Sequence, residues 1–180
     1  MSLQKHSKTR VNKKISAREF RLQGTDGIRS EAKLSSSEEI ANLTPQEVFL
    51  ELGYITEEFM EIYAYAHIRQ LISERKIRPG DNVVIGWDPR DPKGNYPSAV
   101  ISGACKAGVN ALIVGVVPTP LIPMYMLYKN ACGGFMVTAS HNPKDQNGIK
   151  IFCSFKGLKL LPDNDVILTR AVLEVEPSTL

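Results

Sequence analysis

Apolar residues recur at helical spacing in the first half of the chain. Over residues 59–71 they return every three or four positions, which is typical of a helix with one buried face. Thr56, followed by two glutamates, predicts the start of this helix, and Pro79-Gly80 predicts its end. Thr44 predicts an earlier helix start, because a proline and, three residues on, a glutamate follow this hydroxyl cap.

Beyond residue 81, short apolar runs alternate with helical segments. The predicted strands cover residues 82–87, 111–117, 134–138 and 149–152, and the predicted helices cover 98–107, 121–128 and 165–174. The last strand follows a predicted tight turn at 146–148, and it is antiparallel if that turn closes a hairpin. The alternation predicts a three-layer α/β/α domain with a mixed, largely parallel sheet covered on both faces.

Composition narrows the class of protein. The chain has 180 residues, 43% of them hydrophobic and 23% charged, which fits one ordinary globular domain and excludes disorder of the whole chain. No apolar run approaches the roughly 20 residues that a membrane span needs, so no membrane partner is expected. The three cysteines form no CxxC pair, so we expect no disulfide framework and no zinc site. A reducing, cytoplasmic setting fits best.

The net charge of +3 is unevenly distributed. Residues 1–18 contain six lysines and arginines and no acid, which leaves 16 basic against 19 acidic residues in the remainder. We therefore divide the chain into a basic tail (1–18), a domain (19–176) and a linker (177–180). The tail either contacts an acidic surface or is a solvated terminus. No aromatic residue interleaves its charges, so no nucleic-acid partner is expected.

Polar turns follow three of the predicted parallel strands, where ligands collect in α/β sheets. The turn after residue 138 carries the most chemistry, because Ser140, His141 and Asn142 offer a hydroxyl, an imidazole and an amide in succession. A serine hydrolase is not indicated, since Ser140 lacks the flanking glycines of a nucleophile elbow and an adjacent histidine is poorly placed as its base. His67, within the amphipathic helix, is expected to be structural.

Phosphate chemistry fits these residues better. The loop at 24–29 combines two glycines, backbone amides and an arginine fork suited to phosphate oxygens, so Gly24, Thr25 and Arg29 are candidate phosphate ligands together with Asn142. Lys150 either folds back toward Ser140 or is an ordinary exposed strand lysine. The nucleotide-binding loops GxxxxGK[ST] and GxGxxG are missing, so the phosphate is not expected to belong to ATP or NAD.

Four motifs, in order along the chain, resemble the first domain of the α-D-phosphohexomutases. This superfamily includes phosphoglucomutases, phosphomannomutases and phosphoglucosamine mutases, and the resemblance favours the phosphomannomutase/phosphoglucomutase branch. The motifs are GTDGIR at 24–29, GWDPR at 86–90, VPTP at 117–120 and TASHNPKDQNGIK at 138–150. The sequence departs from the family pattern in the length of residues 31–52 and in the basic tail.

The resemblance implies a role for each matching residue. Ser140 matches the serine that is phosphorylated and passes its phosphoryl group to the sugar, and its phosphate would also be a ligand of Mg²⁺. His141 and Lys150 match residues that position the serine and handle proton and charge. Arg29 matches an arginine that lines the same site, whereas Asp88 and Arg90 match a supporting motif.

The resemblance also implies partners that the sequence does not contain. The other Mg²⁺ ligands are expected in a DGDxDR loop of a second domain, and the remaining mutase domains would read the phosphorylated hexose. Hexose 1,6-bisphosphate is the expected intermediate and activator. The chain alone is then expected to be inactive. The alternative is a non-catalytic module that binds a sugar phosphate or mediates dimerisation.

Overall fold

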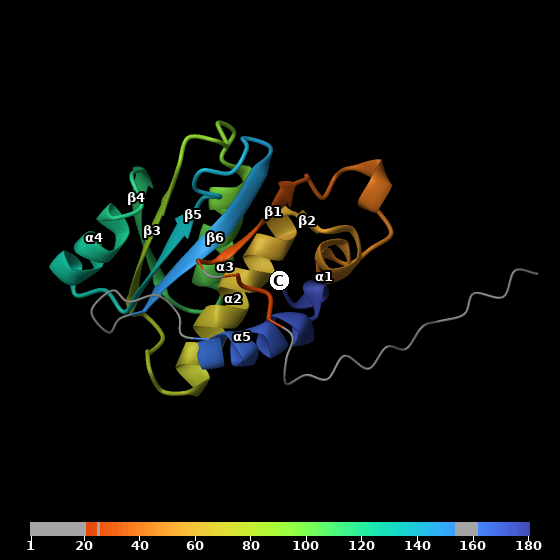
Figure 1. Cartoon of the computed structure of the whole chain (residues 1–180). Coiled ribbons are helices and arrows are strands. Elements are labelled where there is room, and N and C mark those ends of the chain that lie inside the picture. The colour runs from red at the N-terminus through yellow and green to blue at the C-terminus, as the bar shows by residue number, and fades with distance from the viewer. Residues whose placement is uncertain (1–20, 25, 154–161) are drawn as a thin grey trace, which may run out of the picture.

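The computed structural model describes residues 21–24, 26–153 and 162–180, which form a three-layer α/β/α arrangement (Figure 1). The strands are β1 (Ile28–Ala32), β2 (Tyr54–Ile55), β3 (Asn82–Trp87), β4 (Asn110–Val116), β5 (Gly133–Val137) and β6 (Gln146–Cys153). The α-helices are α1 (Pro45–Glu47), α2 (Glu57–Ser73), α3 (Asn95–Lys106), α4 (Leu121–Lys129) and α5 (Pro162–Glu174). Shorter helical turns are η1 (Glu38–Ile40), η2 (Val48–Leu52) and η3 (Pro177–Thr179).

The sheet has the strand order β2-β1-β6-β5-β3-β4. β3 pairs in parallel with β4 and β5, and β1 pairs in parallel with β2. β6 lies between β1 and β5 and is antiparallel to both. The predicted mixed, largely parallel sheet is confirmed. Because β6 runs against its neighbours, its first residues lie beside β1 and the segment that leaves β5.

Helices cover both faces of the sheet, as predicted. α4 lies on one face, where it packs on Val84, Met136 and Phe152. α2, α3 and α5 lie on the other face, and α2 is the most deeply buried of them (Figure 1). Burial of large apolar side chains on two faces at roughly 25 cal/mol per Å² is the main stabilising contribution.

The two predicted helix starts are confirmed. The Thr56 side chain accepts the backbone N–H of Phe59, and α2 begins at Glu57. Thr44 and Glu47 form a reciprocal capping box, although α1 has only three residues before the π-helical turn η2. α2 ends at Ser73, earlier than the predicted stop at Pro79, and Arg75 then takes a left-handed φ of +58° that departs from the helical path.

One local prediction needs correction, and two strands were missed. Residues 146–148 are not a turn but the first residues of β6, where Asn147 pairs with Ser30 and is buried. Gly148 allows close packing against β1 here and does not reverse the chain. The strands β1 and β2 were not predicted, because β1 is mostly polar and β2 has only two residues.

His67 is buried in α2, in keeping with its expected structural role. Its ring lies edge-on to Phe135, with 5.7 Å between the ring centroids. Burial lowers the pKa of this imidazole to about 4, since a charged ring would be desolvated there. His67 is therefore neutral near physiological pH and packs as a core aromatic.

The remaining predictions concern the ends and the surface. The basic tail lies outside the described residues, whereas 177–180 contain η3, and Leu180 packs against the core. Cys105, Cys132 and Cys153 are free thiols. Of the helices in the described parts of the chain, none is long and apolar enough to cross a bilayer.

Candidate functional site

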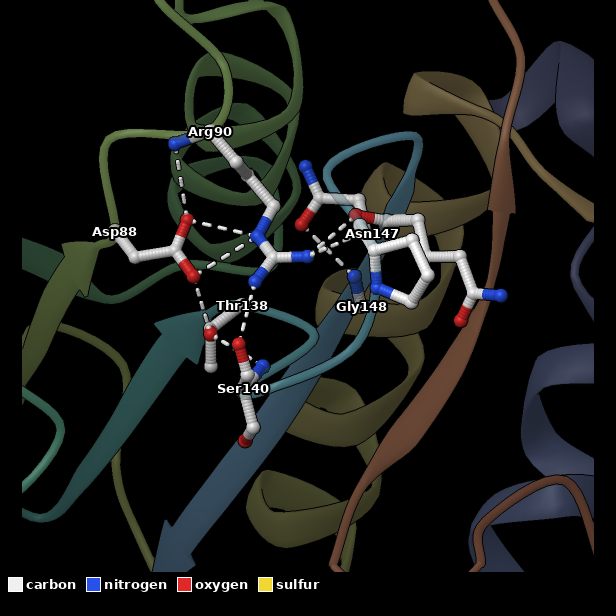
Figure 2. A network of polar contacts seen from close by, with 8 residues as sticks. Asp88, Arg90, Thr138, Ser140, Asn147 and Gly148 are labelled. Atoms are coloured by element: carbon white, nitrogen blue, oxygen red, sulfur yellow. Dashed lines mark hydrogen bonds and ion pairs between the residues drawn. The ribbon is translucent and has the colours of Figure 1, made fainter.

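The polar residues that follow β3 and β5 form a closed set of hydrogen bonds (Figure 2). Arg90 Nε donates to both carboxylate oxygens of Asp88, at 2.9 Å each, and Arg90 Nη2 donates to the Ser140 carbonyl oxygen at 2.7 Å. Thr138 Oγ1 donates to Asp88 Oδ2 and accepts the Ser140 N–H at 2.8 Å. We call these four residues, Asp88, Arg90, Thr138 and Ser140, the serine ring.

Arg90 also holds the far end of the serine loop, which we define as the connection between β5 and β6 (138–145). Its Nη1 donates to the carbonyl oxygens of Pro143, at 3.2 Å, and Gln146, at 2.7 Å. One guanidinium therefore binds both ends of the connection between β5 and β6. The Arg90 side chain is only 11% exposed and that of its partner Asp88 19% exposed, so both charged groups are largely shielded from solvent and bind each other and the loop.

The three successive side chains Ser140, His141 and Asn142 do not converge on one point. The Ser140 hydroxyl points away from the Arg90 guanidinium (Figure 2), and no hydrogen bond from it is found among the described residues. His141 is exposed. The Asn142 side chain donates to Gln146 Oε1 at 2.7 Å, so its amide closes the loop instead of facing outward.

A second group of charges lies where β1 and β6 run side by side. Lys150 Nζ is 2.9 Å from Asp26 Oδ2, and Arg29 Nη2 is 3.2 Å from the same oxygen and 2.8 Å from the Asp26 carbonyl oxygen. We call Asp26, Arg29 and Lys150 the cation cluster. Two cations against one carboxylate leave a net positive charge, which favours an anionic ligand.

Burial decides between the two interpretations of Lys150. Its side chain is 9% exposed, so the alternative of an ordinary exposed strand lysine is wrong. No hydrogen bond or ion pair joins Lys150 to Ser140 in the described structure; its ion-pair partner is Asp26. Beside the cluster, Leu22, Gly24, Asp26, Gly27 and Arg29 line a cavity of about 250 Å³.

Gly148 links the serine ring to the cation cluster. It pairs with Arg29 on β1, and on its other side its carbonyl oxygen accepts the Thr138 N–H at 2.9 Å. Neighbouring strands lie about 4.8 Å apart, so the backbones of Arg29 and Thr138 are roughly 10 Å from each other. A Cβ atom on Gly148 would come within 2.1 Å of the Ile28 carbonyl oxygen, so only glycine fits there.

The glycine loop at 24–29 is partly closed on itself. The Gly24 N–H donates to the Gly27 carbonyl oxygen at 3.1 Å, so this amide is already paired within the loop. Gly27 has a φ of +84°, and a Cβ atom there would lie 2.3 Å from the Ile149 carbonyl oxygen. Thr25, the other candidate phosphate ligand of this loop, lies outside the described residues.

Comparison with known proteins agrees with this arrangement. The family model described as "Phosphoglucomutase/phosphomannomutase, alpha/beta/alpha domain I" matches residues 21–177. The chain belongs to this family. The expected relation to the first domain of the phosphohexomutases is thereby confirmed.

Individual relatives of this domain I are sugar-phosphate mutases. Phosphoglucosamine mutase from Francisella tularensis subsp. novicida is 37% identical over 137 residues, which are 76% of this chain and 26% of the relative. The enzyme of the same name from Desulfotalea psychrophila is 33% identical over 165 residues, 87% of this chain and 31% of the relative. The chain thus spans about a quarter to a third of the length of these curated relatives.

Solved structures give the same fold. A putative phosphomannomutase from Thermus thermophilus superposes with a TM-score of 0.63 at 25% identity, over 84% of this chain and 30% of that one. A phosphoglucomutase/phosphomannomutase family protein from Burkholderia thailandensis superposes with a TM-score of 0.55 at 25% identity, over 66% and 26%.

Sequence reasoning missed three residues of this domain I site. Thr138, Asp26 and Gly148 were seen only as parts of motifs, yet they connect the predicted residues to one another. The available signal was chemical, since a buried lysine and a buried arginine each require an acceptor. What the sequence does not contain is the pairing, because Thr138 meets Asp88 across 50 positions.

The described part of this domain I does not provide a complete set of Mg²⁺ ligands. The ion prefers six oxygen ligands, usually including one or two carboxylates. Within residues 21–24, 26–153 and 162–180, no three His, Cys, Asp or Glu side chains come together in a way that could hold a metal ion. Asp88 is engaged by Arg90 and Thr138, and Asp26 by Arg29 and Lys150.

Proposed function

We propose that this chain is the phosphoserine-bearing domain of a phosphohexomutase, which interconverts hexose 1-phosphate and hexose 6-phosphate through a hexose 1,6-bisphosphate. Ser140 is the residue that carries the phosphoryl group. The proposal extends the family membership of the chain to an activity of the whole protein, to which other domains would contribute.

The observation that best supports the proposal is the presentation of Ser140. Its backbone is fixed on both sides by the serine ring, while its hydroxyl takes no part in the ring (Figure 2). A net positive cluster lies at the same end of the sheet, where the backbone of Arg29 is two strand spacings, roughly 10 Å, from that of Thr138. A fixed nucleophile beside a positive field is what phosphoryl transfer requires, because positioning and charge neutralisation do most of the work.

In the proposed transfer, an oxygen of the hexose phosphate attacks the phosphorus of phosphorylated Ser140. The bond from phosphorus to Ser140 Oγ breaks, a bond from phosphorus to the sugar oxygen forms, and the sugar hydroxyl proton replaces the phosphoryl group on Ser140. His141, exposed beside the serine, is the proposed carrier of that proton. Lys150 and Arg29 would balance the anionic charge.

Three hexoses are candidates for the sugar of the substrate. The sequence resemblance favours the phosphomannomutase/phosphoglucomutase branch, whereas the two curated relatives are named phosphoglucosamine mutases. Glucosamine, glucose and mannose phosphates should therefore be tested side by side. Mg²⁺ belongs to the proposal as a cofactor that takes one phosphoserine oxygen from this chain and its other ligands from elsewhere.

Peptide-resolved mass spectrometry of the protein purified from its own cells tests the proposal. We expect one phosphoryl group on the peptide that contains residues 138–150, located on Ser140. A Ser140→Ala variant should lack it and a Ser36→Ala variant, changed at a serine outside the site, should keep it. An active mutase without phosphate on Ser140 would contradict the proposal.

The second candidate is a non-catalytic module that binds a sugar phosphate. It is favoured because the described residues provide two cations, Arg29 and Lys150, but no group of side chains that could hold a metal ion. Calorimetry with hexose phosphates separates the two: binding that is equal for wild type and Ser140→Ala, with no phosphoserine in the purified protein, would favour the module. We expect the 180-residue chain alone to show no significant turnover under either function.

A further inference from the structure

Ser140 has an unusual backbone conformation. Its φ is +57°, in the left-handed region that residues with a Cβ atom rarely adopt. Among the described residues other than glycine, Arg75 and Asn130 share a positive φ. Both follow the ends of helices, α2 and α4, where a left-handed residue is a common way to terminate. Ser140 ends no helix, so other contacts must hold its conformation.

The contacts that hold it are the two backbone bonds of Ser140. Its N–H donates to Thr138 Oγ1 at 2.8 Å, and its carbonyl oxygen accepts Arg90 Nη2 at 2.7 Å. With both its amide and its carbonyl fixed, rotation of the Ser140 backbone would break at least one of these bonds. The Ser140 side chain is left outside the ring.

The chemistry of the partners fixes the direction of every bond in the ring. Asp88 only accepts and Arg90 only donates, so the Thr138 hydroxyl must give its single proton to Asp88. A lone pair of Thr138 Oγ1 is then the acceptor that faces the Ser140 N–H. The threonine hydroxyl is thus held in one orientation by a carboxylate that Arg90 neutralises.

We propose that Thr138 is a positioning residue for Ser140, which acts through its hydroxyl, together with Asp88 and Arg90, to keep the serine in the left-handed conformation. This inference rests on the proposed function, because it gives the ring the role of presenting the hydroxyl that carries the phosphoryl group. The geometry of the ring itself comes from the structure.

Two substitutions at one position isolate the hydroxyl. Thr138→Val keeps the shape of the side chain and removes the oxygen, whereas Thr138→Ser keeps the oxygen. In the 180-residue chain, NMR hydrogen exchange at the Ser140 amide should become about five- to tenfold faster in Thr138→Val, the factor expected for loss of one ordinary hydrogen bond. Thr138→Ser should exchange within about twofold of wild type, and amides in β3 should be unchanged in both variants.

A second variant keeps the inference testable if Thr138→Val does not fold. Arg90→Lys retains the charge but cannot serve Asp88 and three carbonyl oxygens at once, so the Ser140 amide should again exchange faster. Arg78→Ala, at an exposed arginine outside the ring, is the control and should leave this amide as in wild type.

The inference is overturned if the Ser140 amide exchanges at the wild-type rate in Thr138→Val or, where that variant does not fold, in Arg90→Lys. It is also overturned if Thr138→Ser exchanges as fast as Thr138→Val, since the hydroxyl would then not be the operative group. These measurements use the unphosphorylated chain. A failure of the proposed function would instead appear as absence of phosphoserine from the purified protein, with the amide pattern unchanged.

Discussion

The serine ring and the cation cluster both place arginine beside aspartate, yet the two arginines are used differently. Arg90 donates to Asp88 and to three carbonyl oxygens of the serine loop, so its guanidinium is occupied by its own chain. The described side-chain hydrogen bonds of Arg29 all start from one nitrogen, Nη2, and end on Asp26. The contacts of Arg90 fix the conformation of the serine loop, whereas the contacts of Arg29 leave positive charge next to a cavity.

This difference assigns different roles to the two arginines. An arginine whose donors are satisfied by backbone oxygens acts on conformation, and a substitution there should mainly change stability. Cations that share one carboxylate act on a ligand, and a substitution there should mainly change the response to an anion.

Arg90→Ala should have the largest effect on stability. It leaves a mostly buried Asp88 carboxylate without its cation and three loop carbonyl oxygens without their donor. We expect the free energy of unfolding to fall by about 3 kcal/mol, measured by urea denaturation. Arg78→Ala should change it by less than about 0.5 kcal/mol, as exposed positions usually do. Equal losses in the two variants would remove the distinction between ring and surface.

Asp26→Asn should have an intermediate and ligand-dependent effect. The substitution keeps the shape of the side chain but leaves Lys150, which is 9% exposed, without its carboxylate. The free energy of unfolding should fall by about 2 kcal/mol. Inorganic phosphate should restore part of this loss, because an anion that binds only the folded state stabilises it.

Asp88→Asn is the matched control for that experiment. It should also be destabilised, because it weakens the bonds to Arg90 and Thr138. Added phosphate should stabilise it no more than it stabilises wild type, as measured by thermal denaturation in phosphate and in chloride at equal ionic strength. A phosphate response as large as that of Asp26→Asn would place an anion site in the ring and contradict the comparison.

Lys150→Met should have the smallest effect on stability. An apolar side chain of similar length replaces the lysine, and Asp26, which is 25% exposed, keeps Arg29 as its cation, so we expect a loss within about 1 kcal/mol. The shift of the melting temperature by phosphate should nevertheless shrink, since the cluster loses one of its two cations. An unchanged phosphate shift would show that the lysine serves the fold and not a ligand.

Much of the fold follows from patterns within short segments. The apolar runs of β3, β4 and β5 and the caps of α1 and α2 are local, so the sequence is sufficient to locate them. β1 escapes prediction because its three central residues, Arg29, Ser30 and Glu31, are polar and break the apolar pattern.

Short sequence patterns likewise reveal residues of the site but not the contacts between them. Ser140, Arg29 and Lys150 are evident from the motifs, but the contact of Lys150 with Asp26 joins opposite ends of the domain. Such a pairing depends on the strand order, in which β6 enters between β1 and β5. Asn147-Gly148 shows the converse error, because a dipeptide typical of turns lies inside a strand where close approach to β1 requires glycine.

If the serine ring presents Ser140 to the positive field of the cation cluster, a phosphate on Ser140 should respond to those cations. A ³¹P NMR titration of the chain that carries phosphoserine at position 140, with and without Lys150→Met, measures this response. We expect the second pKa of this phosphate to lie below that of an ordinary phosphoserine, because nearby cations favour the dianion, and to rise toward the ordinary value in Lys150→Met. A pKa at the ordinary value in both proteins would contradict the claim.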